Sequence, residues 1–261
     1  MDVRLDGRTA LITGGSLGLG RAMGTEFARS GASVALVSRT KETLDEAVDE
    51  IAGIAPDIQV RGYSCDVRDS DGLATTHAAI VTELGPVDIL VNNAGTSAAK
   101  PFELVTDEDW QNDLDLKFMA AVRLARLCIP AMKEQGWGRI INVLNTAAKA
   151  PPARSTPTSV SRAAGMALTK ALAAELAPHG ILVNALNTGV LLTNQWRRLH
   201  SEQAPEASFE EYIATRAKPV PLGRLGDAAE FANLACFLAS DHGSYITGTA
   251  INVDGGLSPV V

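Results

Sequence analysis

The sequence has few aromatic residues, few cysteines and no long apolar run, and each shortage excludes something. Aromatic residues make up 5% of the 261 positions, so the interior must be aliphatic and rich in alanine. The cysteines Cys65, Cys128 and Cys236 are odd in number and widely spaced, which is typical of neither a disulfide framework nor a metal site. No segment approaches the ~18 uncharged apolar residues of a membrane span. Residues 1–8 carry charges where a signal peptide has its apolar core.

Positive charge is also in deficit. Lysine and arginine together number 23 against 30 acidic residues, which gives a net charge of −7. This balance argues against binding to nucleic acid or to an anionic membrane. With 46% hydrophobic and 20% charged positions the composition is that of a globular protein, and α/β folds often reach this length as one domain. We therefore expect a single domain over residues 1–261 of a cytoplasmic, enzyme-like protein.

Strand and helix patterns alternate along the whole chain. Short, continuously apolar runs predict buried strands at 9–13, 33–38, 58–63, 87–91, 139–144, 181–186 and 250–253. Helical patterns lie between them, at about 18–30, 41–53, 69–84, 107–134, 157–177 and 227–239. Strands that do not alternate in polarity are typical of a parallel sheet with helices on both faces. The pattern predicts an α/β fold with a doubly wound parallel sheet of about seven strands.

One interval, 190–221, interrupts this alternation with a long, charged and irregular sequence. A segment of this length inside a compact domain is usually a functional lid or a disordered insertion. Apolar residues within it favour a partly helical substrate lid, since they need partners to bury against: Trp196, Leu199, Phe209, Tyr212 and Ile213.

A glycine-rich turn links the first predicted strand to the first helix, over residues 13–20. Its glycines allow a tight turn and a close approach of the backbone to a ligand. The N-terminus of the helix offers free N–H groups and a positive dipole end to a pyrophosphate. We therefore expect a dinucleotide to contact Gly14, Ser16, Leu17, Gly18, Leu19 and Gly20.

Several further motifs stand in fixed order along the chain: Cys65-Asp66-Val67, Asn92-Asn93-Ala94-Gly95, Pro221-Leu222-Gly223-Arg224, Ile246-Thr247-Gly248 and Asp254-Gly255-Gly256. Together with the TGxxxGxG pattern at 13–20, they make the chain resemble the short-chain dehydrogenase/reductase family over nearly its whole length. The resemblance implies a Rossmann-type fold, a nicotinamide cofactor, hydride transfer and a small-molecule substrate. It also implies cofactor contacts from Asp66, Val67, Asn92, Ala94, Gly95, Gly189 and Thr193.

The end of the second predicted strand indicates which cofactor is used. NAD sites place a carboxylate there for the ribose hydroxyls, whereas this chain has Ser38 followed by Arg39. An arginine pairs with a 2′-phosphate that a carboxylate would repel, so NADP is favoured over NAD. In the alternative interpretation Arg39 is a solvated loop residue.

The family's usual catalytic residues, Asn, Ser, Tyr and Lys, have no counterpart at the corresponding positions. Alignment with the family pattern puts Lys117 at the asparagine position, Asn145 at the serine position, and Thr158 and Arg162 in the Tyr-x-x-x-Lys element. An aliphatic alcohol is a much weaker acid than a phenol, and arginine does not shuttle protons. Arg162 shares a helical face with Thr158 and would hold the nicotinamide ribose. Simpler structural alternatives are that Lys117 pairs with Asp113 and that Asn145 caps its strand.

No tyrosine of the chain has a lysine four residues later; Tyr212 has Arg216 there but lies in the predicted lid. Three functions remain open. The first is an oxidoreductase acting on a carbonyl or alcohol with Lys117, Asn145, Thr158 and Arg162 as a rearranged catalytic set. The second is a catalytically silent NADP-binding sensor or partner subunit, and the third a non-redox enzyme catalysing elimination or dehalogenation. The intact glycine turn disfavours the third, and Thr188-Gly189 departs from the family's Pro-Gly.

Assembly and substrate are predicted only broadly. The resemblance implies a homodimer or homotetramer built on the helices at about 107–134 and 157–177. Alanines on the second helix would allow close packing, or would pack only on their own sheet: Ala163, Ala164, Ala167, Ala171 and Ala174. The lid aromatics suggest that the substrate has an apolar body. Arg197, Arg198 and His200 suggest a contact with an anionic group of the substrate, or they contact only solvent.

Overall fold

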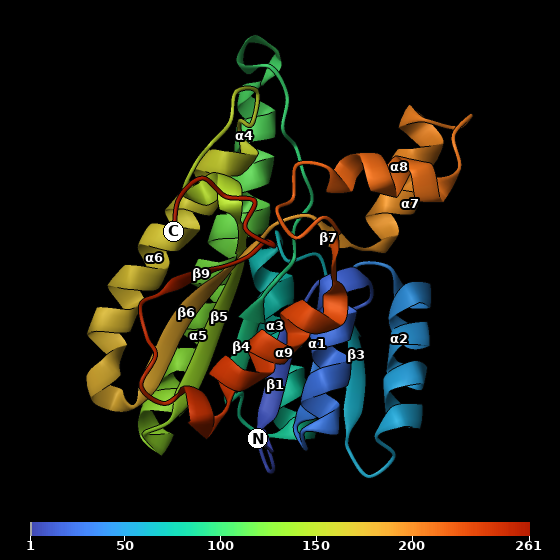
Figure 1. Cartoon of the computed structure of the whole chain (residues 1–261). Coiled ribbons are helices and arrows are strands. Elements are labelled where there is room, and N and C mark those ends of the chain that lie inside the picture. Colours follow the sequence, from blue (N-terminus) through green and yellow to red (C-terminus); the bar gives the residue numbers. More distant parts are fainter. Residues whose placement is uncertain (1) are drawn as a thin grey trace.

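A parallel sheet with strand order β3-β2-β1-β4-β5-β6-β9 runs through the computed structural model, which describes residues 2–261 except the side chains of Asn194, Gln195 and Arg198. Within these residues the sheet has seven strands (Figure 1). They are β1 Thr9–Thr13, β2 Ser33–Ser38, β3 Val60–Ser64, β4 Ile89–Asn92, β5 Gly138–Asn145, β6 Ile181–Thr188 and β9 Ala250–Val253. The order reverses between β1 and β4, so the predicted doubly wound sheet is confirmed. The ligand contact that the sequence suggests for Arg198 lies outside the described residues.

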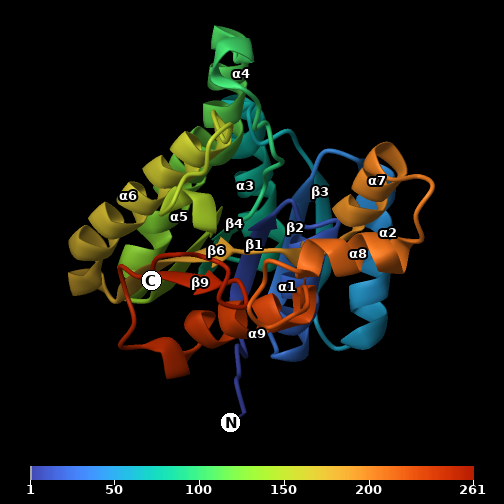
Figure 2. The ribbon, with the colours of Figure 1, turned by 45° about the horizontal axis from the view of Figure 1, so that its top comes forward.

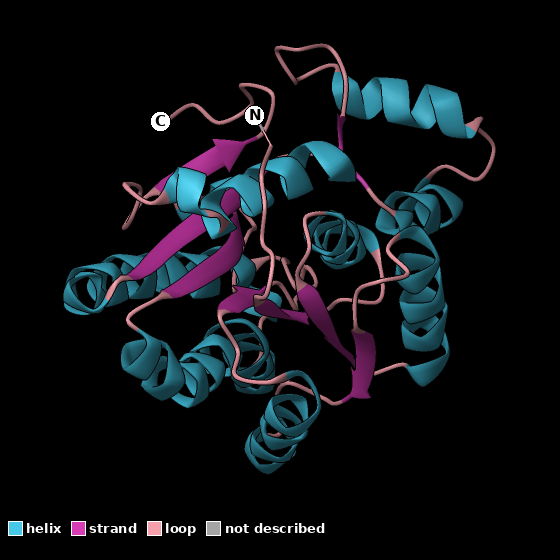
Figure 3. Cartoon of the chain, turned by 90° about the horizontal axis from the view of Figure 1, so that it is seen from below, coloured by secondary structure: helices cyan, strands magenta, loops and turns pink. Residues whose placement is uncertain are grey.

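Helices cover both faces of the sheet, as the view from below shows (Figure 3). They are α1 Gly18–Arg29, α2 Lys41–Ile54, α3 Ser70–Leu84, α4 Asp107–Leu114, α5 Ala120–Gln135, α6 Thr158–Leu176, α7 Asn194–Gln203, α8 Phe209–Ala217 and α9 Ala228–Ala239. Helices α1, α2 and α9 pack on one face, and α3, α5 and α6 on the other. No helix among the described residues has both the length and the apolar character needed to cross a membrane.

Two hydrophobic cores lie on the two faces of the sheet, and both are mainly aliphatic, as the composition predicts. The core under α1 and α9 includes Phe27, Phe231 and Cys236, and the core under α3 and α5 includes Cys65 and Cys128. All three thiols are free. Strands β1, β5 and β6 are buried along most of their length because helices cover both of their faces, which explains their mostly apolar sequence, whereas β3 at the edge of the sheet is largely exposed.

One predicted helix is interrupted. The sequence predicts a continuous helix over 107–134, but α4 ends at Leu114 and a π-helical segment, Asp115–Met119, precedes α5. Such single wide turns often occur at functional sites. The segment carries Lys117, whose side chain is buried against α6. The helix predicted from the sequence is uninterrupted here, and this turn was not anticipated.

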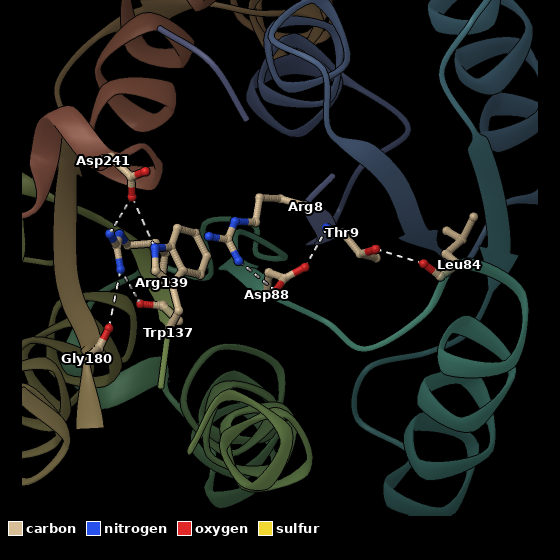
Figure 4. A network of polar contacts seen from close by, with 9 residues as sticks. Arg8, Thr9, Leu84, Asp88, Trp137, Arg139, Gly180 and Asp241 are labelled. Carbon is tan, nitrogen blue, oxygen red and sulfur yellow. Dashed lines mark hydrogen bonds and ion pairs between the residues drawn. The ribbon is translucent and has the colours of Figure 1, made fainter. Parts of the chain in front are cut away.

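Three stacked side chains, Arg8, Trp137 and Arg139, cover the amino-terminal end of the strands (Figure 4). Trp137 lies between the guanidinium groups of Arg8 and Arg139, which are 3.6 Å and 4.1 Å from its ring centroid. Asp241 accepts a hydrogen bond from the Trp137 indole (3.1 Å), and Asp88 accepts one from Arg8 (3.4 Å). Burial lowers the pKa of Arg139 to about 10. The stack joins the starts of β1, β4 and β5 to the segment after α9.

The interval 190–221 contains α7, α8 and the two-residue strand β7, Leu191–Leu192, which pairs with β8, Gly226–Asp227. Figures 1 and 2 both place α7 and α8 beyond the carboxyl ends of the strands, on the side of α2. Tyr212 is buried between these two helices, with its ring 6.3 Å from that of Trp196 and its hydroxyl bonded to Gln203 (3.1 Å). The aromatic side chains therefore form a small core of their own.

Candidate active site

A cleft of about 590 Å3 lies at the carboxyl ends of the strands, where the strand order reverses. The loops that follow β1, β2, β3, β4, β5 and β6 all contribute to its walls, together with the start of α6. Open α/β sheets bind their ligands at this position. The predicted residues on its surface are Gly14, Ser16, Leu17, Gly18, Leu19, Ser38, Arg39, Val67, Ala94, Gly95, Asn145, Thr158, Arg162 and Thr193.

The glycine turn has a conformation that other residues would disturb. Gly14 and Gly18 have positive φ values of 63° and 54°, in the left-handed region that favours glycine. A Cβ on Gly14 would lie 3.0 Å from the Asn93 amide, which itself donates to the Thr13 carbonyl (2.8 Å). Helix α1 then begins without a side-chain cap. Its first N–H groups thus remain available for a pyrophosphate, and the structure fits such a group.

The other end of the turn meets β2. The Ser16 and Ser38 hydroxyls lie 2.9 Å apart, and the exposed Arg39 follows at the cleft wall. Thr40 and Thr43, which the sequence did not single out, line the same wall. This part of the cleft offers hydroxyl groups and a cation, and no carboxylate lines it.

Five predicted residues do not line the cleft. The Asp66 carboxylate is bound by Arg68, whose hydrogen bonds lower the pKa of that carboxyl group. Asn92 bonds to Asn142 across β4 and β5. Gly20 and Gly189 allow close packing: a Cβ on Gly20 would collide with the Gly14 carbonyl, and one on Gly189 would lie 2.5 Å from the Cα of Asp254. Lys117 also does not line the cleft. The full set is Gly20, Asp66, Asn92, Lys117 and Gly189.

Sequence reasoning also missed residues on the cleft surface. They are mostly neighbours of the predicted ones: Val37, Thr40, Thr43, Cys65, Asn93, Thr96, Ser97, Leu116, Val143, Leu144 and Thr188. Asn93 and Thr188 belong to motifs already noted, so the spacing signal for them existed. Thr96, Ser97 and Leu116 have no such signal, because their position depends on how the loops fold over the strands.

Asn145, Thr158 and Arg162 line the end of the cleft next to the carboxyl end of β5. The Arg162 guanidinium donates to the Val143 carbonyl (2.6 Å), and its Nε has no partner. Burial lowers the pKa of Arg162 to about 10, so it stays charged at neutral pH. Asn145 makes no capping bond and its buried Oδ1 is unpartnered, contrary to the capping alternative. A site with unpartnered polar atoms at a cleft wall is suited to a polar ligand.

Lys117 and Asp113 form a buried ion pair, as the structural alternative predicted, with side-chain exposures of 1% and 2%. The pair has two further bonds. Lys117 Nζ donates to the Thr158 hydroxyl (3.2 Å), and the Ser161 hydroxyl donates to the other Asp113 oxygen (2.6 Å). Burial lowers the pKa of Lys117 to about 8, although Asp113 opposes this shift. An amine with this pKa is a proton donor near neutral pH.

Among the described residues no group of three or more His, Cys, Asp and Glu side chains is arranged to hold a metal ion.

The chain is similar to known oxidoreductases over its full length. The family model described as Enoyl-(Acyl carrier protein) reductase matches residues 14–258. A 3alpha-hydroxysteroid dehydrogenase of Mediterraneibacter gnavus is 35% identical over 255 residues, which cover 98% of each chain.

Two solved structures show the same similarity in three dimensions. L-sorbose reductase of Gluconobacter frateurii, complexed with NADPH and L-sorbose, has a TM-score of 0.96 at 34% identity and full coverage of both chains. An NADPH-bound short-chain oxidoreductase of Pseudomonas aeruginosa PAO1, described as containing an atypical catalytic center, has a TM-score of 0.91 at 34% identity over 99% of both chains. These relatives support the use of NADP(H). With its fold, cleft and matching family model, the chain belongs to the short-chain dehydrogenase/reductase family and is a short-chain oxidoreductase.

Proposed function

We propose that this enzyme transfers hydride between NADP(H) and a carbonyl or alcohol substrate at a site without the usual tyrosine and lysine. The observation that carries the proposal is the continuous cleft from the glycine turn to Asn145, Thr158 and Arg162. The turn and the uncapped start of α1 would hold the pyrophosphate, with Ala94, Gly95, Val67 and Thr193 along the rest of the cofactor. Gly20, Asp66, Asn92 and Gly189 would act from behind, by shaping these loops.

The preference for NADP rests on Arg39. Its side chain is exposed at the cleft wall beside Thr40 and Thr43, where a 2′-phosphate would accept hydrogen bonds. Ser38, which replaces a carboxylate, is already bonded to Ser16 and offers no negative charge. The NADPH-bound relatives support the same preference.

Three side chains would act on the substrate. The bound cofactor supplies or accepts the hydride. The Asn145 amide and the Thr158 hydroxyl would hold the substrate oxygen, and the buried Arg162 cation would stabilise the negative charge that develops on that oxygen. Lys117 has no direct access to the cleft, so any contribution to proton transfer passes through Thr158.

Residues 190–221 would serve as the substrate lid. Thr193, which immediately precedes α7, lines the cleft and lies 3.5 Å from the Cβ position of Gly18. The insertion therefore starts at the cleft. Aromatic side chains of α7 and α8 pack on one another, so the two helices would move as one unit. The position of that unit would decide which lid residues face the substrate.

Calorimetric titration with NADPH and NADH, followed by an absorbance assay of NADPH consumption against a broad ketone panel, tests this function. We expect NADPH to bind at least about 10-fold more tightly than NADH, as one charge-assisted bond is worth about 1.5–3 kcal/mol. Consumption should occur with at least one ketone. Tight NADPH binding without consumption across the panel would instead support a catalytically silent sensor. Failure to bind either nucleotide would contradict both.

A further inference from the structure

A buried polar network lies directly behind the catalytic end of the cleft. It consists of Asp113 on α4, Lys117 in the π-helical segment, and Thr158 and Ser161 on α6, and we name it the Lys117 network. All four side chains are buried, with residue exposures between 1% and 6%. Asp113 accepts from Lys117 with one carboxylate oxygen and from Ser161 with the other (2.6 Å), so its orientation is fixed on both sides.

Thr158 connects this network to the cleft. Its Oγ1 accepts hydrogen bonds from Lys117 Nζ (3.2 Å) and from the backbone N–H of Ala98 (2.9 Å). A hydroxyl group has two acceptor lone pairs and one donor proton. Since both lone pairs are engaged, the proton of Thr158 is left to be donated to a third group. Thr158 lines the cleft and Lys117 does not, so a ligand bound in the cleft has access to that proton.

The charges favour a proton leaving this network toward the substrate. Two cations, Lys117 and Arg162, lie close to the single carboxylate of Asp113, and the repulsion from Arg162 adds to the effect of burial on the lysine. Loss of one proton from Lys117 would relieve this excess of positive charge. Arg162 is the weaker acid of the two cations, so the lysine is the group that yields the proton.

We propose that Lys117 is the proton source for carbonyl reduction, that the Thr158 hydroxyl passes the proton to the substrate, and that Asp113 is the positioning residue that holds the lysine. The proposal rests on the reductase function above. Hydride from NADPH forms the new C–H bond and NADPH becomes NADP+. The substrate oxygen takes the Thr158 proton, Thr158 takes one from the Lys117 ammonium, and Lys117 is left as a neutral amine. Water that enters the cleft after product release returns the proton by the same route.

Substitution at the two ends of the relay tests it directly. Thr158→Val keeps the shape of the side chain but removes the hydroxyl, and Thr158→Ser retains it. We expect kcat to fall about 100-fold or more in Thr158→Val and in Lys117→Met, a typical loss for a general acid, and to stay within a few-fold in Thr158→Ser. Lys133→Met, at an exposed lysine near the end of α5, is the matched control. NADPH affinity, measured by calorimetry, should change less than about threefold in all four.

The pH dependence tests the position of the proton source. Reduction requires the ammonium form of Lys117, so kcat should be high below its pKa and fall as the pH rises through about 8. Asp113 holds that pKa up while burial and Arg162 hold it down, so Asp113→Asn should move the fall in kcat to lower pH. A readout without cofactor is the NMR titration of lysine Nζ signals. One signal should titrate near pH 8, disappear in Lys117→Met and titrate at lower pH in Asp113→Asn.

The failures are distinguishable. An active wild-type enzyme whose kcat is equal in Thr158→Val and Thr158→Ser overturns the relay and leaves the reductase function standing. This pair decides the matter even if Lys117→Met, which leaves a buried carboxylate without its cation, does not fold. Unchanged kcat and pH profile in Lys117→Met also overturn the relay. A wild-type enzyme that binds NADPH and reduces no carbonyl overturns the proposed function and the relay with it.

Discussion

At the scale of single residues, the open question of the proposed site is which side chain donates a proton to the substrate. In the proposed catalytic set, Thr158 stands in place of a phenol with a hydroxyl of far lower acidity, and Arg162 stands in place of a proton-exchanging amine with a cation that keeps its proton. The ability to donate a proton near neutral pH therefore has to come from elsewhere. The structure places a buried amine, Lys117, in contact with Thr158. The sequence indicated Lys117 as a candidate, but not its contact with Thr158.

Cofactor choice is tested at the same scale by charge reversal. Arg39→Glu should weaken NADPH binding by about 10- to 100-fold, because it replaces the proposed partner of the 2′-phosphate with a group that would repel it. NADH affinity should change little. Arg61→Glu makes the same charge change on β3, at an exposed residue outside the cleft. Calorimetry of both variants with both nucleotides gives the answer, and equal losses for NADPH and NADH in Arg39→Glu would contradict the assignment.

At the scale of elements, the strand and helix pattern was predictable because burial on both faces leaves a plain signal in the sequence. The bounds of β1, β2 and β9 match the predicted runs, whereas β3 and β4 begin two residues later than predicted. The π-helical segment and the contacts of Asp113 and Ser161 were not predictable. They join residues 48 positions apart, and such contacts depend on how α4 and α6 pack.

The stack at the base of the sheet gives a stability prediction for these elements. Trp137→Leu removes two cation–π contacts, each worth about 0.5–2 kcal/mol, and should lower the free energy of unfolding by about 1–4 kcal/mol. NADPH affinity should be unaffected, because the stack lies at the opposite end of the strands from the cleft. Trp137→Phe keeps an aromatic ring between the arginines and is the matched control. Denaturant unfolding would refute the prediction if the Leu and Phe variants lost stability equally.

At the scale of the whole molecule, α6 presents a surface that the single chain leaves open. Ala167, Ala171 and Ala174 are exposed, so they do not pack only on their own sheet, and Val160 on the same helix is 46% exposed. Small side chains allow a second helix to approach closely. We therefore keep the prediction of a homodimer or homotetramer in which this helix face is covered by another copy.

Light scattering tests this assembly. The wild-type enzyme should have a molar mass of two or four times 27.4 kDa. Ala171→Glu places a charge on the helix face and should shift the enzyme to a smaller species, whereas Ala78→Glu on an exposed position of α3 should not. A wild-type protein that remains monomeric at micromolar concentration would contradict the prediction.

The reactivity of the three free thiols reports on local unfolding and on occupancy of the cleft. Cys128 lies on α5 and Cys236 on α9, on opposite faces of the sheet, and burial raises their pKa values to about 12 and 11. A thiol reagent, which attacks the thiolate, reaches them only when the corresponding helix layer detaches. Cys65 lies at the cleft wall and should be shielded by a bound dinucleotide. Alkylation rates at the three sites would thus separate fraying of each helix layer from exchange of the nucleotide, without any introduced label.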